Sequence, residues 1–120
     1  MWDYNVHKRI IMKQYLTPEQ TAKLIELGFD RPKSIEEYTP KEALVCLKQR
    51  YAYSIGELMK MLPKIHPLYH DPYCLDIGFD TVKWIVGYTY DNGYVEVVNS
   101  YELIDALYEM VVKLKEEGVI

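Results

Sequence analysis

The spacing of hydrophobic residues in the second half of the chain changes from every second position to every third or fourth. Residues 73–79, 82–90 and 94–98 alternate between the two faces of half-buried strands. Residues 100–117 carry apolar side chains at the spacing of a helix with one buried face. The sequence therefore predicts an α+β fold, in which a three-stranded antiparallel meander packs one face on a C-terminal helix.

Two turn signals set the expected register of this meander. Asn92-Gly93 is a strong hairpin signal because both residues tolerate the positive φ of a type I′ turn, and Asp80-Thr81 is the expected loop of the first hairpin. These loops give the facing pairs Phe79–Val82, Ile77–Trp84, Leu75–Val86, Tyr90–Val95 and Tyr88–Val97. The other face is half polar, and we expect the N-terminal helices or another copy of the chain to cover it. That face carries Ile85, Gly87 and Val98.

The C-terminal helix has recognisable start and stop signals. Asn99 is the expected N-cap, with Glu102 closing a capping box three residues later, and Ser100 is an alternative cap. Gly118 is the expected stop, because glycine tolerates the left-handed conformation that ends many helices. The apolar stripe of this helix is expected to pack on the sheet face that carries Trp84 and Val86.

The N-terminal half predicts two to three short helices. Gly28 ends the first of them, and Phe29 is well placed to fold back on its last turn. No linker is long enough to separate domains, so residues 1–120 are expected to form a single α+β domain. The helices would begin at capping boxes whose N-caps are Thr17, Thr39 and Ser54.

Composition and charge argue against several classes of protein. The net charge of −4 and the scattered basic residues do not fit a dedicated binder of nucleic acids or anionic membranes. No apolar run approaches the ~20 residues that span a bilayer, and no signal-peptide pattern is present. Two cysteines, Cys46 and Cys74, give no disulfide framework, so the expected compartment is the cytoplasm and both thiols are expected to be free. No motif implies a cofactor.

One short segment has the residue types of a metal site. His66, His70, Asp71 and Cys74 combine nitrogen, oxygen and sulfur ligands at spacings that would suit zinc. Prolines at 67 and 72 prevent a continuous helix from presenting both imidazoles on one face, and a structural zinc site usually has two or more cysteines. The favoured interpretation is a pair of solvent-exposed loop histidines, so no metal ligand is assigned.

Other reactive arrangements have simpler explanations. Cys74 with His70 lacks an identifiable third residue to orient a nucleophile and its base. Asp76 and Asp80 fit the polar face of one strand, which accounts for their spacing without acid–base chemistry. Asp91-Asn92-Gly93 lacks the full ligand series of a calcium loop. We therefore expect no catalytic site.

Tyrosine is the clearest functional indication. The chain has 12 tyrosines but only two phenylalanines, and tyrosine is enriched at interfaces because a large apolar ring carries a hydroxyl that tolerates water. Many of the tyrosines fall in predicted loops or at element ends. The candidate interface residues are Tyr51, Tyr53, Tyr69, Tyr73 and Tyr94; packing of loops over a small core is the alternative interpretation.

Residues 53–120 also resemble a group of small uncharacterised proteins of Bacteroidetes and of their phages and mobile elements. The resemblance lies in the run from Ile55-Gly56-Glu57-Leu58 to Leu62-Pro63, the Trp/Tyr-rich hairpin after it, and the helix Glu102–Met110. The group has no assigned activity. The resemblance implies a bacterial cytoplasmic or phage-derived origin and carries no chemistry to any position here.

The favoured function from sequence is non-catalytic protein binding or self-association, through tyrosine-bearing loops and an exposed strand edge. The first alternative is a small metal-binding protein or enzyme that uses the loop with His66, His70, Asp71 and Cys74. The second alternative is a binder of single-stranded nucleic acid, with tyrosine rings stacking on bases beside Lys83 or Arg50. It ranks last because no basic groove is predicted, and the expected partner is a protein.

Overall fold

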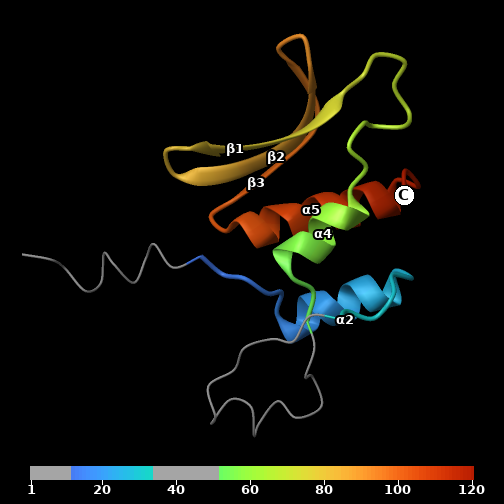
Figure 1. Ribbon diagram of the computed structural model, residues 1–120, viewed down its shortest axis with the longest axis vertical. Helices are drawn as coiled ribbons and strands as arrows, with labels where there is room; N and C mark the ends of the chain where they lie inside the picture. The colour runs from blue at the N-terminus through green and yellow to red at the C-terminus, as the bar shows by residue number, and fades with distance from the viewer. Residues whose placement is uncertain (1–11, 34–51) are drawn as a thin grey trace, which may run out of the picture.

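The computed structural model describes residues 12–33 and 52–120, and this part of the chain folds into three helices and a three-stranded sheet (Figure 1). The strands pair antiparallel in the order β1-β2-β3. The predicted α+β class and meander are confirmed, whereas the helix predicted to begin at Thr39 lies outside the described residues. The elements are α2 (Pro18–Glu26), α4 (Ile55–Met61), β1 (Cys74–Asp80), β2 (Lys83–Tyr90), β3 (Gly93–Ser100) and α5 (Leu103–Glu116).

The sheet lies on α5, and α2 lies on the side of α5 away from the sheet (Figure 1). α5 packs on β2 and β3 and also contacts α4. Val86 and Tyr88 of β2 are fully buried in one cluster with Leu107 and Met110 of α5, and Trp84 packs against that cluster. The prediction that the Trp84 and Val86 face lies on the C-terminal helix is confirmed.

Local capping fixes the ends of α2. The Thr17 hydroxyl accepts a hydrogen bond from the Gln20 amide, and the Gln20 side chain accepts one from the Thr17 amide, as a capping box requires. At the other end Gly28 has a φ of 104°, and the Phe29 amide donates to the Leu24 carbonyl. This is a Schellman ending, as predicted. The Ser54 box at the start of α4 is formed in the same way.

The strand register differs from the predicted one by two residues in both hairpins. The loops are Thr81-Val82 and Asp91-Asn92, and Asp91 and Asn92 both have positive φ, 48° and 65°. A type I′ turn is therefore formed one residue earlier than predicted, and Gly93 becomes the first residue of β3. Because a shift of two residues keeps each side chain on its face, β1 and β2 present the expected faces. The observed pairs are Phe79–Trp84, Ile77–Val86, Leu75–Tyr88 and Tyr88–Val95.

A β-bulge in β3 reverses the predicted orientation of two valines. Between the pairs Tyr88–Val95 and Val86–Val98, β3 has one more residue than β2, and Glu96 takes a left-handed φ of 55°. Val98 therefore packs on the core, while Val97 is 41% exposed. The prediction that placed Val97 inward and Val98 on the outer face is wrong, because strict alternation does not hold across a bulge.

The predicted cap of α5 is also wrong. Asn99 and Ser100 remain in β3, where they pair with β2, and Glu102 is the N-cap without a side-chain cap bond. The Glu102 carboxylate instead accepts a hydrogen bond of 3.2 Å from the Lys13 amide. Strand pairing thus competes successfully with the capping box. The predicted stop is confirmed, because Gly118 has a φ of 76° and the Val119 amide donates to the Leu114 carbonyl.

Candidate protein-binding surface

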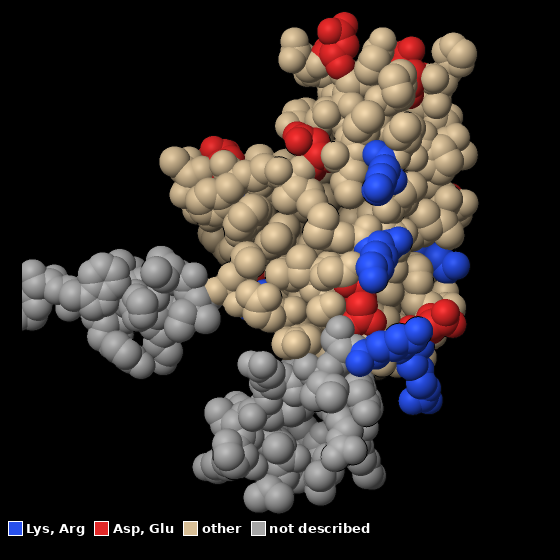
Figure 2. Space-filling model, viewed as in Figure 1, with Lys and Arg blue, Asp and Glu red and all other residues tan. Residues whose placement is uncertain are grey.

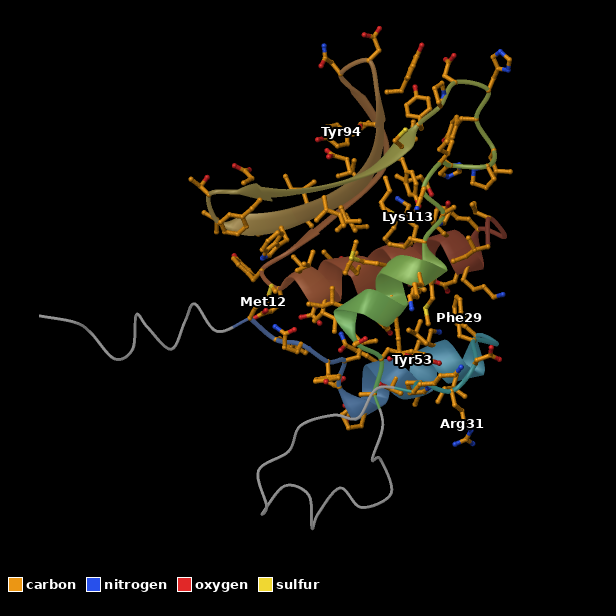
Figure 3. The ribbon with its side chains drawn as sticks, viewed as in Figure 1. Met12, Phe29, Arg31, Tyr53, Tyr94 and Lys113 are labelled. Carbon is orange, nitrogen blue, oxygen red and sulfur yellow. The ribbon has the colours of Figure 1, made fainter. Side chains whose placement is uncertain are left out.

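Of the five candidate tyrosines, one is buried and another lies outside the described residues. Tyr53 is 1% exposed and lies between α4 and α2 (Figure 3), where its hydroxyl donates a hydrogen bond to the Asp30 carbonyl. Burial, with smaller contributions from the charges of Glu57 and Asp30, raises the pKa of Tyr53 to about 12. Tyr53 is therefore a core residue, which corrects its assignment to an interface. Tyr51 lies outside the described residues.

Tyr69 and Tyr73 belong to a row of tilted aromatic rings in contact with one another beside the sheet. The ring centroids are separated by 5.0 Å between Tyr69 and Tyr73 and by 5.6 Å between Tyr73 and Tyr90. The row begins at His66, whose ring centre is 4.7 Å from that of Tyr69. These are ordinary distances for stabilising aromatic pairs. The structure therefore brings together two residues predicted from sequence, and it adds His66 and Tyr90 to them.

Tyr94 lies on the sheet face that points away from the helices (Figure 3). Its hydroxyl donates to the Asp76 carboxylate at 3.2 Å. A Cβ at Gly87 would lie 3.0 Å from the Tyr94 ring. The ring therefore passes close over Gly87 in the central strand β2, on its way from β3 to Asp76 in β1. Tyr94 therefore covers a gap left by a glycine, and its position is separate from the ring row.

His66 is the one buried residue among the four that were considered as an alternative metal site, with 2% exposure. Its Nδ1 accepts a hydrogen bond of 3.3 Å from the Leu68 amide, so the neutral imidazole carries its proton on Nε2, which lies 3.9 Å from a Glu96 carboxylate oxygen. The expectation of an exposed side chain is wrong for His66. The other three residues are exposed: His70, Asp71 and Cys74.

The described residues contain no group of three or more His, Cys, Asp and Glu side chains that could hold a metal ion. The hydrogen bond from the Leu68 amide disfavours metal binding at His66. A metal ion at Nε2 would require the proton to move to Nδ1, which faces this amide. Cys74 is a free thiol, and it donates to the Pro72 carbonyl. In the described structure, hydrogen bonds and ring packing hold this loop in place.

Burial and one carboxylate shift the pKa of His66 in opposite directions. Desolvation lowers the pKa of His66 below its ordinary value of 6.5, and the Glu117 carboxylate partly opposes this effect. A hydrogen bond with Glu96, followed by desolvation, raises the pKa of Glu117, while Lys113 lowers it. The rings of Tyr69 and Tyr88 pack edge-on with the imidazole, with ring centres 4.7 Å and 5.2 Å away.

We expect His66 to make the fold less stable in mild acid. The unfolded chain binds a proton at His66 as pH falls below about 6.5, whereas the folded chain binds it only at lower pH. This contribution to the free energy of unfolding is therefore present above pH 6.5 and is lost as pH falls through the folded pKa. The measurement is urea unfolding at a series of pH values for the unmodified protein and for His66→Asn, which keeps an acceptor for the Leu68 amide.

The variant should lose less stability on acidification than the unmodified protein. The raised pKa of Glu117 acts in the opposite direction, because its contribution is fully present below about 4.5 and is lost as pH rises through the folded pKa. Exposed His70 provides the matched control, and His66→Asn should change the pH profile more than His70→Asn does. Equal profiles for all three proteins would contradict the assignment.

The free edge of β1 is the main feature that sequence analysis did not locate. The Leu75 amide donates to the Lys64 carbonyl, so this amide points away from β2. Backbone groups alternate in direction along a strand, so the N–H and C=O groups of Ile77 and Phe79 also point away from β2. Residues 64–66 cover only the start of β1. We call the outward backbone groups of Ile77 and Phe79 the free edge; they have no backbone partner among the described residues.

An exposed apolar patch lies at the end of the sheet next to this edge. Phe79 is 56% exposed and its ring centre is 5.1 Å from that of Trp84. Val82 in the adjoining turn is 61% exposed, and Tyr101 beyond β3 is 69% exposed. Tyr101 lies at the opposite edge of the sheet, so we call only Phe79, Val82 and Trp84 the Phe79 patch. The sequence signal for it was the pair of apolar residues, Phe79 and Val82, on either side of the predicted loop Asp80-Thr81.

No known protein provides a precedent for the free edge or the Phe79 patch. Among the helices described here, none has the length and apolar character needed to cross a lipid bilayer. The similarity of residues 53–120 to small Bacteroidetes and phage proteins stays a prediction. Comparison of the chain with protein-family models, with curated proteins and with solved structures finds no match to any of them.

Proposed function

We propose that this chain is a non-catalytic protein-binding module that pairs an extended segment of a partner protein with the free edge of β1. The observation that carries the proposal is the outward direction of the Ile77 and Phe79 backbone groups. An unpaired strand edge is a ready template for another strand, and many binding domains take up peptides in this way.

The surroundings of the edge support this function. α5 packs on β2 and β3, so the added strand would continue the sheet on the side of β1 that this helix does not occupy. The Phe79 patch would then offer apolar contacts at one end of the added strand. The ring row with Tyr69, Tyr73 and Tyr90 lies near the other end of β1. Backbone bonds would supply affinity, and these side chains would supply selectivity.

Natural proteins commonly protect edges with lysine, proline or a bulge. β3, the other edge of the sheet, has such a bulge at Glu96. β1 has none of these protections between Asp76 and Asp80, although it carries these two acidic residues. This difference favours β1 as the binding edge.

Phe79→Pro tests the proposal, because it removes an amide hydrogen that points outward while leaving the bonds between β1 and β2. Proline is tolerated on edge strands for this reason. We expect peptides selected from a displayed random library by the unmodified protein to bind Phe79→Pro at least about tenfold more weakly, since about 1.4 kcal/mol corresponds to a tenfold loss. Binding is measured by fluorescence anisotropy on synthetic copies of the selected peptides.

Phe79→Ala is the matched control, because it removes the ring and keeps the amide. Peptides that use the edge should bind Phe79→Ala more tightly than Phe79→Pro. Equal binding to both variants would assign the recognition to the ring alone, and undiminished binding to Phe79→Pro would refute pairing at this edge.

A further inference from the structure

We infer that the partner segment is a strand in which basic residues alternate with apolar ones. This inference rests on the proposed function, because it names the chemistry of the segment that pairs with β1. Three features of the edge carry it. They are the carboxylates of Asp76 and Asp80, the open position at Gly78, and the apolar side chains of Ile77 and Phe79.

The two carboxylates are exposed and lie on the same face of β1. They are four residues apart, which is about 13 Å along a strand. Asp76 accepts a hydrogen bond from the Tyr94 hydroxyl, and Asp80 accepts one from the Thr81 hydroxyl. No described Lys, Arg or His lies within ion-pair distance of either. Each carboxylate can therefore accept a lysine or arginine from an added strand.

Neighbouring basic residues do not neutralise this face. Lys83 lies directly opposite Asp80 in the sheet, yet its ammonium group sits over the Tyr101 ring, 5.0 Å from the ring centre. On the side shown in Figure 2, the visible charged side chains over the sheet are acidic. Lys and Arg lie over the helices and over the segment that connects α4 with β1. The field at the sheet therefore favours a basic partner.

The alternation follows from the two faces of β1. Partner side chains beside Ile77 and Phe79 would lie on the inner face of the sheet, where Ile77 packs against the core and the Phe79 ring contacts Trp84, so apolar residues fit there. Partner side chains beside Asp76, Gly78 and Asp80 would lie on the outer face. A Cβ at Gly78 would have no heavy atom within 4 Å, so this position leaves room for a long basic side chain to reach across.

A second copy of this chain fits the edge poorly. In an antiparallel pair of two β1 strands centred on Gly78, Asp76 of each copy would lie opposite Asp80 of the other. Like charges directly opposite each other destabilise a strand pair. The charge pattern therefore favours a different protein with a basic segment over a homodimer through this edge.

Short peptides of one length test the inference on the full chain. In the first, lysine alternates with valine; in the second, threonine replaces lysine; in the third, glutamate replaces it. Binding is followed by NMR as changes in the backbone amide signals of residues 76–80. We expect the lysine peptide to bind about 2- to 30-fold more tightly than the threonine peptide, from two exposed charge pairs. The glutamate peptide should bind most weakly.

The double variant Asp76→Asn with Asp80→Asn separates charge from shape, because asparagine retains an oxygen acceptor. The preference for lysine should disappear in this variant and at about 1 M salt, where screening acts over about 3 Å. Equal binding of all three peptides at residues 76–80 would overturn the inference and leave the proposed function standing. No change at residues 76–80 with any peptide would overturn both. If the signals of residues 76–80 change with protein concentration alone, the edge pairs with a second copy of the chain. That result would overturn the inference of a basic partner segment.

Discussion

Leu107→Ala is expected to lower the free energy of unfolding by about 2–5 kcal/mol, the range for removing a buried leucine side chain from a core. Leu107 is fully buried in α5, and it belongs to the cluster that includes Val86 and Tyr88 on the inner face of the sheet. The truncation would leave a cavity between the helix and the sheet. Urea unfolding followed by circular dichroism measures the change.

Leu68→Ala is the matched control, because it removes the same atoms from a side chain that is 69% exposed. Exposed substitutions usually change stability by no more than about 0.5 kcal/mol. Equal effects of the two substitutions would show that the face of α5 bearing Leu107 does not seal the sheet.

Gly87→Ala is expected to destabilise the sheet by about 1–3 kcal/mol, the range for forcing extra atoms into packed structure. A Cβ at this position would lie 3.0 Å from the Tyr94 ring, 3.1 Å from a Val97 methyl group and 3.3 Å from the Glu96 carbonyl. The ring would have to move, and its hydrogen bond with Asp76 would be lost. Urea unfolding gives the stability, and the NMR signal of the Asp76 amide reports the movement of the ring.

Gly78→Ala provides the comparison on the neighbouring strand. Its Cβ would meet no atom within 4 Å, and its backbone does not need a positive φ. Alanine restricts the unfolded chain more than glycine does, so this substitution should stabilise the protein by up to about 1 kcal/mol. Opposite signs at the two glycines are the expected result. Destabilisation of similar size at both would mean that Tyr94 does not cover Gly87.

Signals that act within a few residues were read correctly from the sequence. The capping box at Thr17 and the Schellman endings at Gly28 and Gly118 depend only on side chains and φ angles inside one segment. Alternation likewise gave the correct faces for β1 and β2, even though both registers were displaced by two residues. A displacement of two residues is invisible to a pattern whose period is two.

Features that depend on distant contacts were not predictable in the same way. The run Val95-Glu96-Val97-Val98 fits an inward strand in either of two registers, and packing on α5 selects the one that needs a bulge. The Asn99 capping signal was overridden because this residue pairs with β2. Burial of His66 arises from Tyr88 and Glu96, which lie more than twenty residues away in the sequence.

The candidate site shows the same division. Tyrosine enrichment indicated a binding surface, and the structure brings Tyr69 and Tyr73 into one ring row. It also buries Tyr53, because composition does not reveal which rings the core requires. The free edge of β1 is a property of backbone direction and of what covers each strand. Neither can be read from residue types alone.

Amide hydrogen exchange along β1, measured by NMR on dilute protein, tests the free edge most directly. The amides of Asp76 and Gly78 point toward β2 and should exchange slowly, whereas those of Ile77 and Phe79 point outward and should exchange rapidly. Alternating fast and slow exchange is the predicted result. Slow exchange at all four amides would show that another segment already pairs with this edge, and would contradict the account.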